Sequence, residues 1–113
     1  MDQEHRGLRF AFSAAAEIAP DSLPAAFVPG RVTELSLFGC FLETSASFEM
    51  QRRVLVKIHS SGENLEAPAS VLYIKPSGVG LVFRDIKPEF RAVLQKWILA
   101  ALDARHDPQP TPG

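Results

Sequence analysis

Short runs of alternating apolar residues fill most of this 113-residue chain, and they constrain its fold more than any other feature. Between Arg53 and His59, the residues Val54, Val56 and Ile58 fall on one face of an extended strand. Similar runs, separated by turn residues, span residues 10–18, 31–36, 39–44, 65–75 and 79–83. About five or six short strands joined by turns predict a small antiparallel barrel.

Proline content and strict alternation give two finer predictions within this region. Segment 19–30 carries three prolines and ends in glycine, which predicts a loop or the entrance to an edge strand. In the run that ends at Lys75, alternation places Val71 and Tyr73 on one face of the strand. Leu72 and Ile74 then fall on the other face.

The end of the chain changes period. Apolar residues recur there at helical spacing, at Phe90, Val93, Leu94, Trp97, Ile98, Ala101 and Leu102. Pro88 and Glu89 suit the first turn of a helix, so we expect an amphipathic helix that closes the barrel and buries Trp97. We therefore expect one domain over residues 1–104, with a flexible arm at 1–9 and a disordered, proline-rich tail at 105–113.

Charge and hydropathy exclude several classes of protein. The net charge is −1, from 12 basic and 13 acidic residues, which argues against a general binder of nucleic-acid polymers or anionic membranes. No apolar run approaches the ~20 residues of a membrane-spanning helix. The segment from Met1 to Arg9 lacks the apolar core of a secretory signal, so we expect a cytoplasmic domain.

Catalytic and metal-binding patterns are missing from the sequence. The three histidines, His5, His59 and His106, lie far apart and match no metal-ligand or nucleophile spacing. Cys40 lies inside an apolar run, which predicts a buried and unreactive thiol. We expect no enzymatic activity, no metal and no cofactor.

Two segments together indicate a ligand site. The first is the basic cluster from His5 to Arg9, just before the first predicted strand, and the second runs from Glu34 through Ser36 to Gly39. In this order they resemble the PilZ domain family, which carries an RxxxR arm and a downstream [DN]xSxxG motif. Segment 78–83, GVGLVF, is similar to a later strand of that family. The resemblance implies a six-stranded antiparallel barrel closed by a C-terminal helix, and binding of the bacterial second messenger cyclic di-GMP.

The resemblance also implies which residues contact the ligand, with two departures from the family pattern. The implied site residues are His5, Arg6, Arg9, Glu34, Ser36 and Gly39. His5 stands in the first arginine slot, and Arg6 lies one residue out of register. Glu34 replaces Asp or Asn and adds a methylene. Losing one charge-assisted hydrogen bond costs about 1.5–3 kcal/mol, or about 10- to 100-fold in affinity.

Two interpretations therefore remain open. In the first, the domain is a cyclic di-GMP receptor whose arm orders over the nucleotide and changes the surface shown to an unidentified protein effector. In the second, the domain has lost nucleotide binding and acts as a protein-interaction module. Ser36 and Gly39 have a local alternative as well: a serine bonded to its own turn, and a glycine with positive φ.

Overall fold

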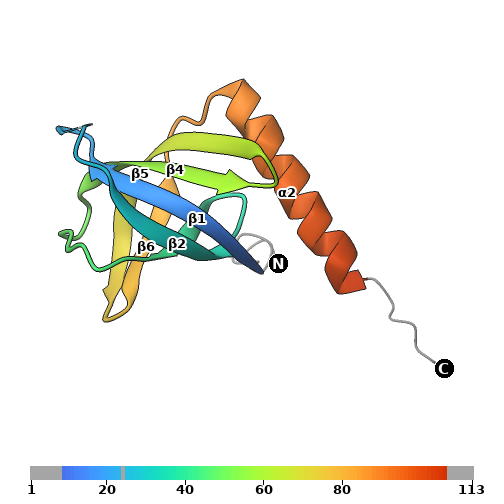
Figure 1. Ribbon diagram of the computed structural model, residues 1–113, viewed down its shortest axis with the longest axis horizontal. Helices are drawn as coiled ribbons and strands as arrows, with labels where there is room; N and C mark the ends of the chain where they lie inside the picture. The colour runs from blue at the N-terminus through green and yellow to red at the C-terminus, as the bar shows by residue number, and fades with distance from the viewer. Residues whose placement is uncertain (1–8, 24, 107–113) are drawn as a thin grey trace.

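Six antiparallel strands form a closed barrel, and one helix lies along its side (Figure 1). The computed structural model describes residues 9–23 and 25–106. The elements are β1 (Phe10–Pro20), β2 (Val28–Leu35), β3 (Gly39–Glu43), β4 (Arg53–Ser60), β5 (Glu63–Lys75), β6 (Gly78–Phe83) and α2 (Pro88–His106). Around the barrel the strands follow the order β1-β2-β3-β6-β5-β4. The predicted fold class is confirmed.

The core fills the barrel as the alternation predicts. Val54, Val56 and Ile58 of β4 are all fully buried, whereas the residues between them are partly exposed. Each such side chain contributes roughly 1.5–3 kcal/mol by leaving water. The period of two along each strand therefore decides which side faces inward.

A β-bulge in β5 changes the predicted faces of that strand. Val71 pairs with Leu81 and Tyr73 pairs with Gly80, so Leu72 is the extra residue between two consecutive pairs. Val71 lies in the core, whereas Tyr73 stands on the outer wall. The prediction that Val71 and Tyr73 share a face is wrong, because a bulge reverses the alternation.

The proline-rich segment is more regular than predicted. β1 extends to Pro20 and β2 begins at Val28, so the connection covers only residues 21–27. Pro29 lies inside β2, opposite Glu17 of β1. The register with β3 begins only at Arg31, so the missing N–H of Pro29 falls where β3 does not pair.

Helix α2 packs on the barrel through the predicted stripe. Leu94, Trp97 and Ile98 are buried, and the Trp97 ring lies 5.4 Å from that of Phe12 on β1. The helix ends at His106, two residues inside the expected tail; the rest of that tail and the arm up to Leu8 lie outside the described residues. Within the described ranges, no helix is long and apolar enough to cross a membrane.

Candidate functional site

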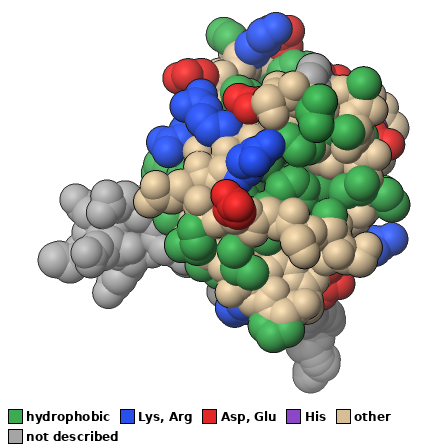
Figure 2. Space-filling view, turned by 90° about the vertical axis from the view of Figure 1, so that its left-hand side faces the viewer, with side chains coloured by type: hydrophobic (Ala, Val, Ile, Leu, Met, Phe, Trp, Pro, Cys, Tyr) green, Lys and Arg blue, Asp and Glu red, His purple; other side chains and the backbone are tan. Residues whose placement is uncertain are grey.

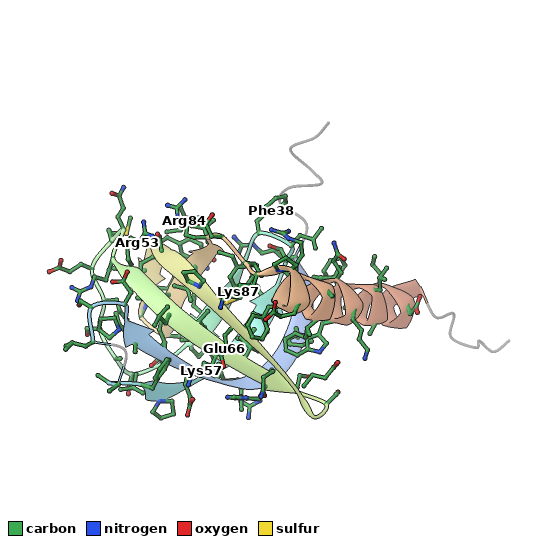
Figure 3. The ribbon with its side chains drawn as sticks, turned by 90° about the horizontal axis from the view of Figure 1, so that it is seen from above. Phe38, Arg53, Lys57, Glu66, Arg84 and Lys87 are labelled. Atoms are coloured by element: carbon green, nitrogen blue, oxygen red, sulfur yellow. The ribbon has the colours of Figure 1, made fainter. Side chains whose placement is uncertain are left out.

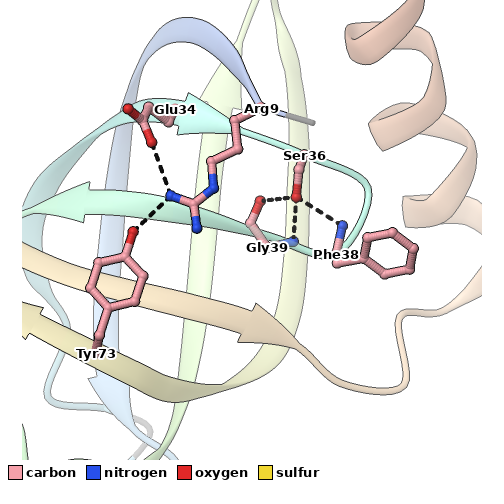
Figure 4. A network of polar contacts seen from close by, with 6 residues as sticks. All are labelled: Arg9, Glu34, Ser36, Phe38, Gly39 and Tyr73. Carbon is pink, nitrogen blue, oxygen red and sulfur yellow. Dashed lines mark hydrogen bonds and ion pairs between the residues drawn. The ribbon is translucent and has the colours of Figure 1, made fainter. Parts of the chain in front are cut away.

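Arg9 is held on the outer wall of the barrel by two side chains from other strands (Figure 4). Its Nη1 donates to the hydroxyl of Tyr73 at 2.7 Å and to Oε1 of Glu34 at 3.1 Å. These two hydrogen bonds, the one to Tyr73 first, raise the pKa of the Arg9 guanidinium. The structure thus brings together two residues from the predicted motifs, Arg9 and Glu34, as an exposed ion pair.

Ser36 organises the turn between β2 and β3. Its hydroxyl accepts hydrogen bonds from the amides of Phe38 and Gly39, each at 3.1 Å, and lies 3.3 Å from the Gly39 carbonyl oxygen. A serine hydroxyl has one donor and two acceptor sites, so these contacts use all of them. The local turn contacts considered for Ser36 are present, and the turn presents Phe38 outward.

Gly39 is required for close approach and not for an unusual backbone angle. Among the described glycines only Gly62 has a positive φ, so the positive φ considered for Gly39 is wrong. A Cβ at Gly39 would overlap the backbone carbonyl of Leu81 on β6. The absence of a side chain lets β3 and β6 pair at this point, with Gly39 opposite Val82.

Three of the motif residues line one depression on the wall. Arg9, Ser36 and Gly39 border it, together with Tyr73 and other residues, chiefly apolar: Phe38, Cys40, Leu72, Leu81 and Val82. Its volume is about 130 Å³, below the roughly 300–1,000 Å³ of enclosed small-molecule pockets. A nucleotide bound here would therefore lie mostly on the outer surface.

An aromatic pair continues this surface beyond Arg9. The rings of Phe41 on β3 and Tyr73 on β5 lie 6.1 Å apart at an interplanar angle of 17°. Both residues pair with Gly80 on β6, the strand that lies between β3 and β5. Lys75 places its Nζ 5.6 Å from the Phe41 ring and 5.5 Å from the Tyr73 ring.

Sequence reasoning missed Tyr73, Phe41 and Lys75 as members of this surface. The bulge at Leu72 moved Tyr73 to the outer wall, and an apolar run gives no sign of a bulge. Gly80 is the signal that was available, because a glycine inside a strand often marks close approach by a neighbouring group.

The remaining predicted residues contribute less to this geometry. His5 and Arg6 lie outside the described residues. Cys40 is buried, as predicted, and desolvation raises the pKa of its thiol to about 12. In the part of the chain that the structure describes, no three His, Cys, Asp or Glu side chains converge as a metal site.

Charges elsewhere on the surface are mixed. On the end of the barrel away from α2, acidic and basic side chains are intermixed over the upper left of the view, and hydrophobic side chains gather to their right (Figure 2). Viewed from above, Arg53 lies at this end and Phe38 at the other (Figure 3). Arg53 is paired loosely with Asp21, at 3.8 Å, so it provides a remote arginine for comparison with Arg9.

Comparison with protein-family models matches the PilZ domain over residues 3–100. This chain belongs to the PilZ domain family. A sequence search among curated proteins gives no match. Solved PilZ structures resemble this one closely in fold despite low sequence identity.

Three of these structures illustrate the likeness. The PilZ domain of CeSA from a cellulose-synthesizing bacterium has 17% identity and a TM-score of 0.65, covering 88% of this chain and all of that one. The PilZ domain of YcgR from Escherichia coli, solved with c-di-GMP, has 14% identity and a TM-score of 0.67, covering 88% and 92%. MotI/DgrA, the inhibitor of motility of Bacillus subtilis, has 17% identity and a TM-score of 0.67, covering 85% and 50%.

Membership of the PilZ family agrees with the order of motifs in the chain. The family match spans the basic cluster, the Glu34–Gly39 motif and most of α2. At such low identity the structural likeness establishes the fold alone.

Proposed function

We propose that this PilZ domain is a non-catalytic receptor that binds cyclic di-GMP on the wall around Arg9. The supporting observation is that Arg9 lines one surface depression together with Ser36 and Gly39, which come from a separate segment of the chain. YcgR, a PilZ protein, has been solved with c-di-GMP, which supports the same ligand class here. We propose that the domain acts in the bacterial cytoplasm and signals to a protein effector.

In this proposal Arg9 is the principal ligand contact. A guanidinium pairs bidentately with a phosphate or with the O6 and N7 atoms of guanine. Ser36 has a positioning role, since its hydroxyl is used within the turn. Gly39 also has a positioning role, since the absence of its side chain lets β3 pair closely with β6 at the depression.

Glu34 competes with the ligand for Arg9. Its carboxylate already accepts from Nη1, at 3.1 Å, and both side chains are nearly half exposed. Exposed ion pairs are worth about 0–1 kcal/mol, so displacing Glu34 from Arg9 costs little. A phosphate can therefore displace Glu34, and the released carboxylate can accept guanine N–H groups.

The arm completes the proposed site. His5 and Arg6 lie four and three residues before Arg9, close enough in sequence to reach a nucleotide held at the wall. We propose that binding orders this arm and changes the surface offered to the effector. Ordering costs conformational entropy, which lowers the affinity relative to a preformed site.

Isothermal titration of cyclic di-GMP into the purified chain tests the proposal. The wild-type protein and Arg53→Ala should bind with similar affinity, and Arg9→Ala should bind at least about 10-fold more weakly. At ~100 μM ligand a 1 μM site stabilises the fold by about 2.7 kcal/mol. No heat and no thermal shift under these conditions would contradict the receptor function.

A second candidate function, a protein-interaction module without nucleotide, is favoured by apolar side chains beside the site. Phe38 is 51% exposed and Leu72 is 54% exposed, and both border the depression. If the nucleotide does not bind, Phe38→Ser should weaken capture of the effector while leaving the melting temperature unchanged. The matched control is Leu99→Ser on the exposed face of α2.

A further inference from the structure

Lys75 is a second cation on the surface that carries Arg9. It lies at the end of β5, two residues after Tyr73, and its Nζ is within 5.6 Å of both rings of the aromatic pair. Within the described part of the chain, it forms no ion pair and no hydrogen bond. Lys75 is exposed, and no carboxylate of the described residues pairs with its ammonium.

Tyr73 connects the two cations. Its hydroxyl accepts from Arg9, whose Cζ lies 5.6 Å from the ring centroid, and its ring faces Lys75 at 5.5 Å. Phe41 contacts Lys75 and stacks on Tyr73. One continuous strip of wall therefore carries a guanidinium, two aromatic rings and an ammonium.

The ligand class requires two such cations. A cyclic dinucleotide has two phosphates, and in the described region Glu34 already offsets part of the charge of Arg9. The first arginine slot of the family motif holds His5, which is not a permanent cation, and Arg6 lies one residue out of register with that slot. An ammonium on a flexible stem binds a phosphate oxygen as a compact point charge, and an exposed cation–π contact is weaker than that interaction.

We propose that Lys75 binds the second phosphate of the ligand and supplies the cation that is absent at His5. This inference rests on the proposed function and extends its site to the end of β5. It makes the site selective for ligands with two phosphates over nucleotides with one. Tyr73 and Phe41 are then positioning residues that keep Lys75 beside Arg9.

The test is titration of cyclic di-GMP into wild-type protein, Lys75→Gln, Lys75→Arg and Lys57→Gln over a series of salt concentrations. Lys57 is a matched control, because its Nζ lies 4.3 Å from the Phe27 ring at a different pocket, between β4 and α2. Lys75→Gln keeps most of the stem and removes the charge. It should weaken binding by about 10- to 100-fold.

Salt dependence separates a phosphate contact from a packing role. Loss of one ionic contact should make the dependence of log Kd on log salt shallower than in the wild type. Lys75→Arg should bind nearly as well as the wild type, and Lys57→Gln should leave both affinity and slope unchanged. Circular dichroism confirms that each variant is folded.

The outcomes distinguish this inference from the proposed function. Wild-type binding together with a Lys75→Gln affinity within about 2-fold of wild type would overturn the role of Lys75 and leave the receptor function standing. Absence of wild-type binding would overturn both.

Discussion

The ring of Tyr73 lies directly on the backbone of Gly80, so that a methyl group on Gly80 would overlap Cε2 and Cζ of the ring. The two residues are paired across β5 and β6. This contact holds the Tyr73 hydroxyl where it accepts from Arg9. A backbone position without a side chain thus determines where a side chain of the candidate site stands.

Gly80→Ala should displace the Tyr73 ring and release Arg9 while the barrel stays folded, because the overlapping atoms belong to a side chain and not to the backbone. Loss of the Phe41–Tyr73 stack contributes about 0.5–1.5 kcal/mol to the decrease in the free energy of unfolding. Urea denaturation of Gly80→Ala, Tyr73→Ala and the double variant measures the coupling. If Gly80→Ala lowers the free energy of unfolding equally in the wild type and in Tyr73→Ala, this explanation is contradicted.

Gly39→Ala should be more damaging, because its methyl group would meet the backbone carbonyl of Leu81. Separating β3 from β6 should lower the free energy of unfolding by at least ~2 kcal/mol. Gly62→Ala is the comparison. Gly62 has a φ of 78°, but a Cβ at this position would meet no atom within 4 Å, so the variant tests the backbone angle without overlap. That variant should cost about 1 kcal/mol. If Gly62→Ala costs as much as Gly39→Ala, the overlap at Leu81 is not the cause.

Trp97 carries a buried Nε1 with no hydrogen-bond partner in the described residues. Trp97→Phe removes this unsatisfied donor and keeps an aromatic ring against Phe12, so the free energy of unfolding should change by less than about 1.5 kcal/mol. Trp97→Ala should cost about 3–5 kcal/mol by leaving a cavity. Urea unfolding followed by far-UV circular dichroism measures both variants. If Trp97→Phe lowers the free energy of unfolding as much as Trp97→Ala does, the Nε1 of Trp97 has a hydrogen-bond partner in solution.

The buried thiol of Cys40 should make the free energy of unfolding decrease as the pH rises in the alkaline range. The pKa of its thiol is raised from 9.0 to about 12 by burial, so between these values the unfolded chain loses a proton that the folded chain keeps. This thiol therefore stabilises the fold below pH ~9 and loses up to ~1.4 kcal/mol of that contribution per pH unit above it. Unfolding of wild type and Cys40→Ala at pH 8 to 10.5 should show the steeper decline in the wild type. Parallel declines would contradict the burial of this thiol.

The architecture was predictable because its causes are local. The alternation at Val54, Val56 and Ile58 and the helical spacing around Trp97 arise from burial of one face of a strand or helix. The pairing of Pro29 within β2 was not predictable, because it depends on where β3 begins to pair.

The candidate site was predictable only as separate motifs. Arg9 and Glu34 were identified from sequence, but their ion pair depends on the register between β1 and β2, which shifts between Ala11 and Ala14. The sequence did not place Tyr73 at the site, because a one-residue bulge cannot be recognised in a run of apolar and aromatic residues such as Val71, Leu72, Tyr73 and Ile74. The need for a glycine at position 39 comes from the backbone carbonyl of Leu81, which lies 42 residues further along the chain (81 − 39).

Closure of the barrel limits how another protein can recognise this domain. Each strand is bonded to a neighbour on both sides, and where β2 runs past β3, Pro29 has no N–H to offer. In the described residues the longer stretches paired on one side only are 10–14 of β1 and 63–68 of β5, and α2 packs on these two strands. A partner therefore finds little sheet edge to which it could add a strand of its own. Recognition must depend on side chains, and point substitutions on the wall, in the turns or on α2 should be able to abolish it.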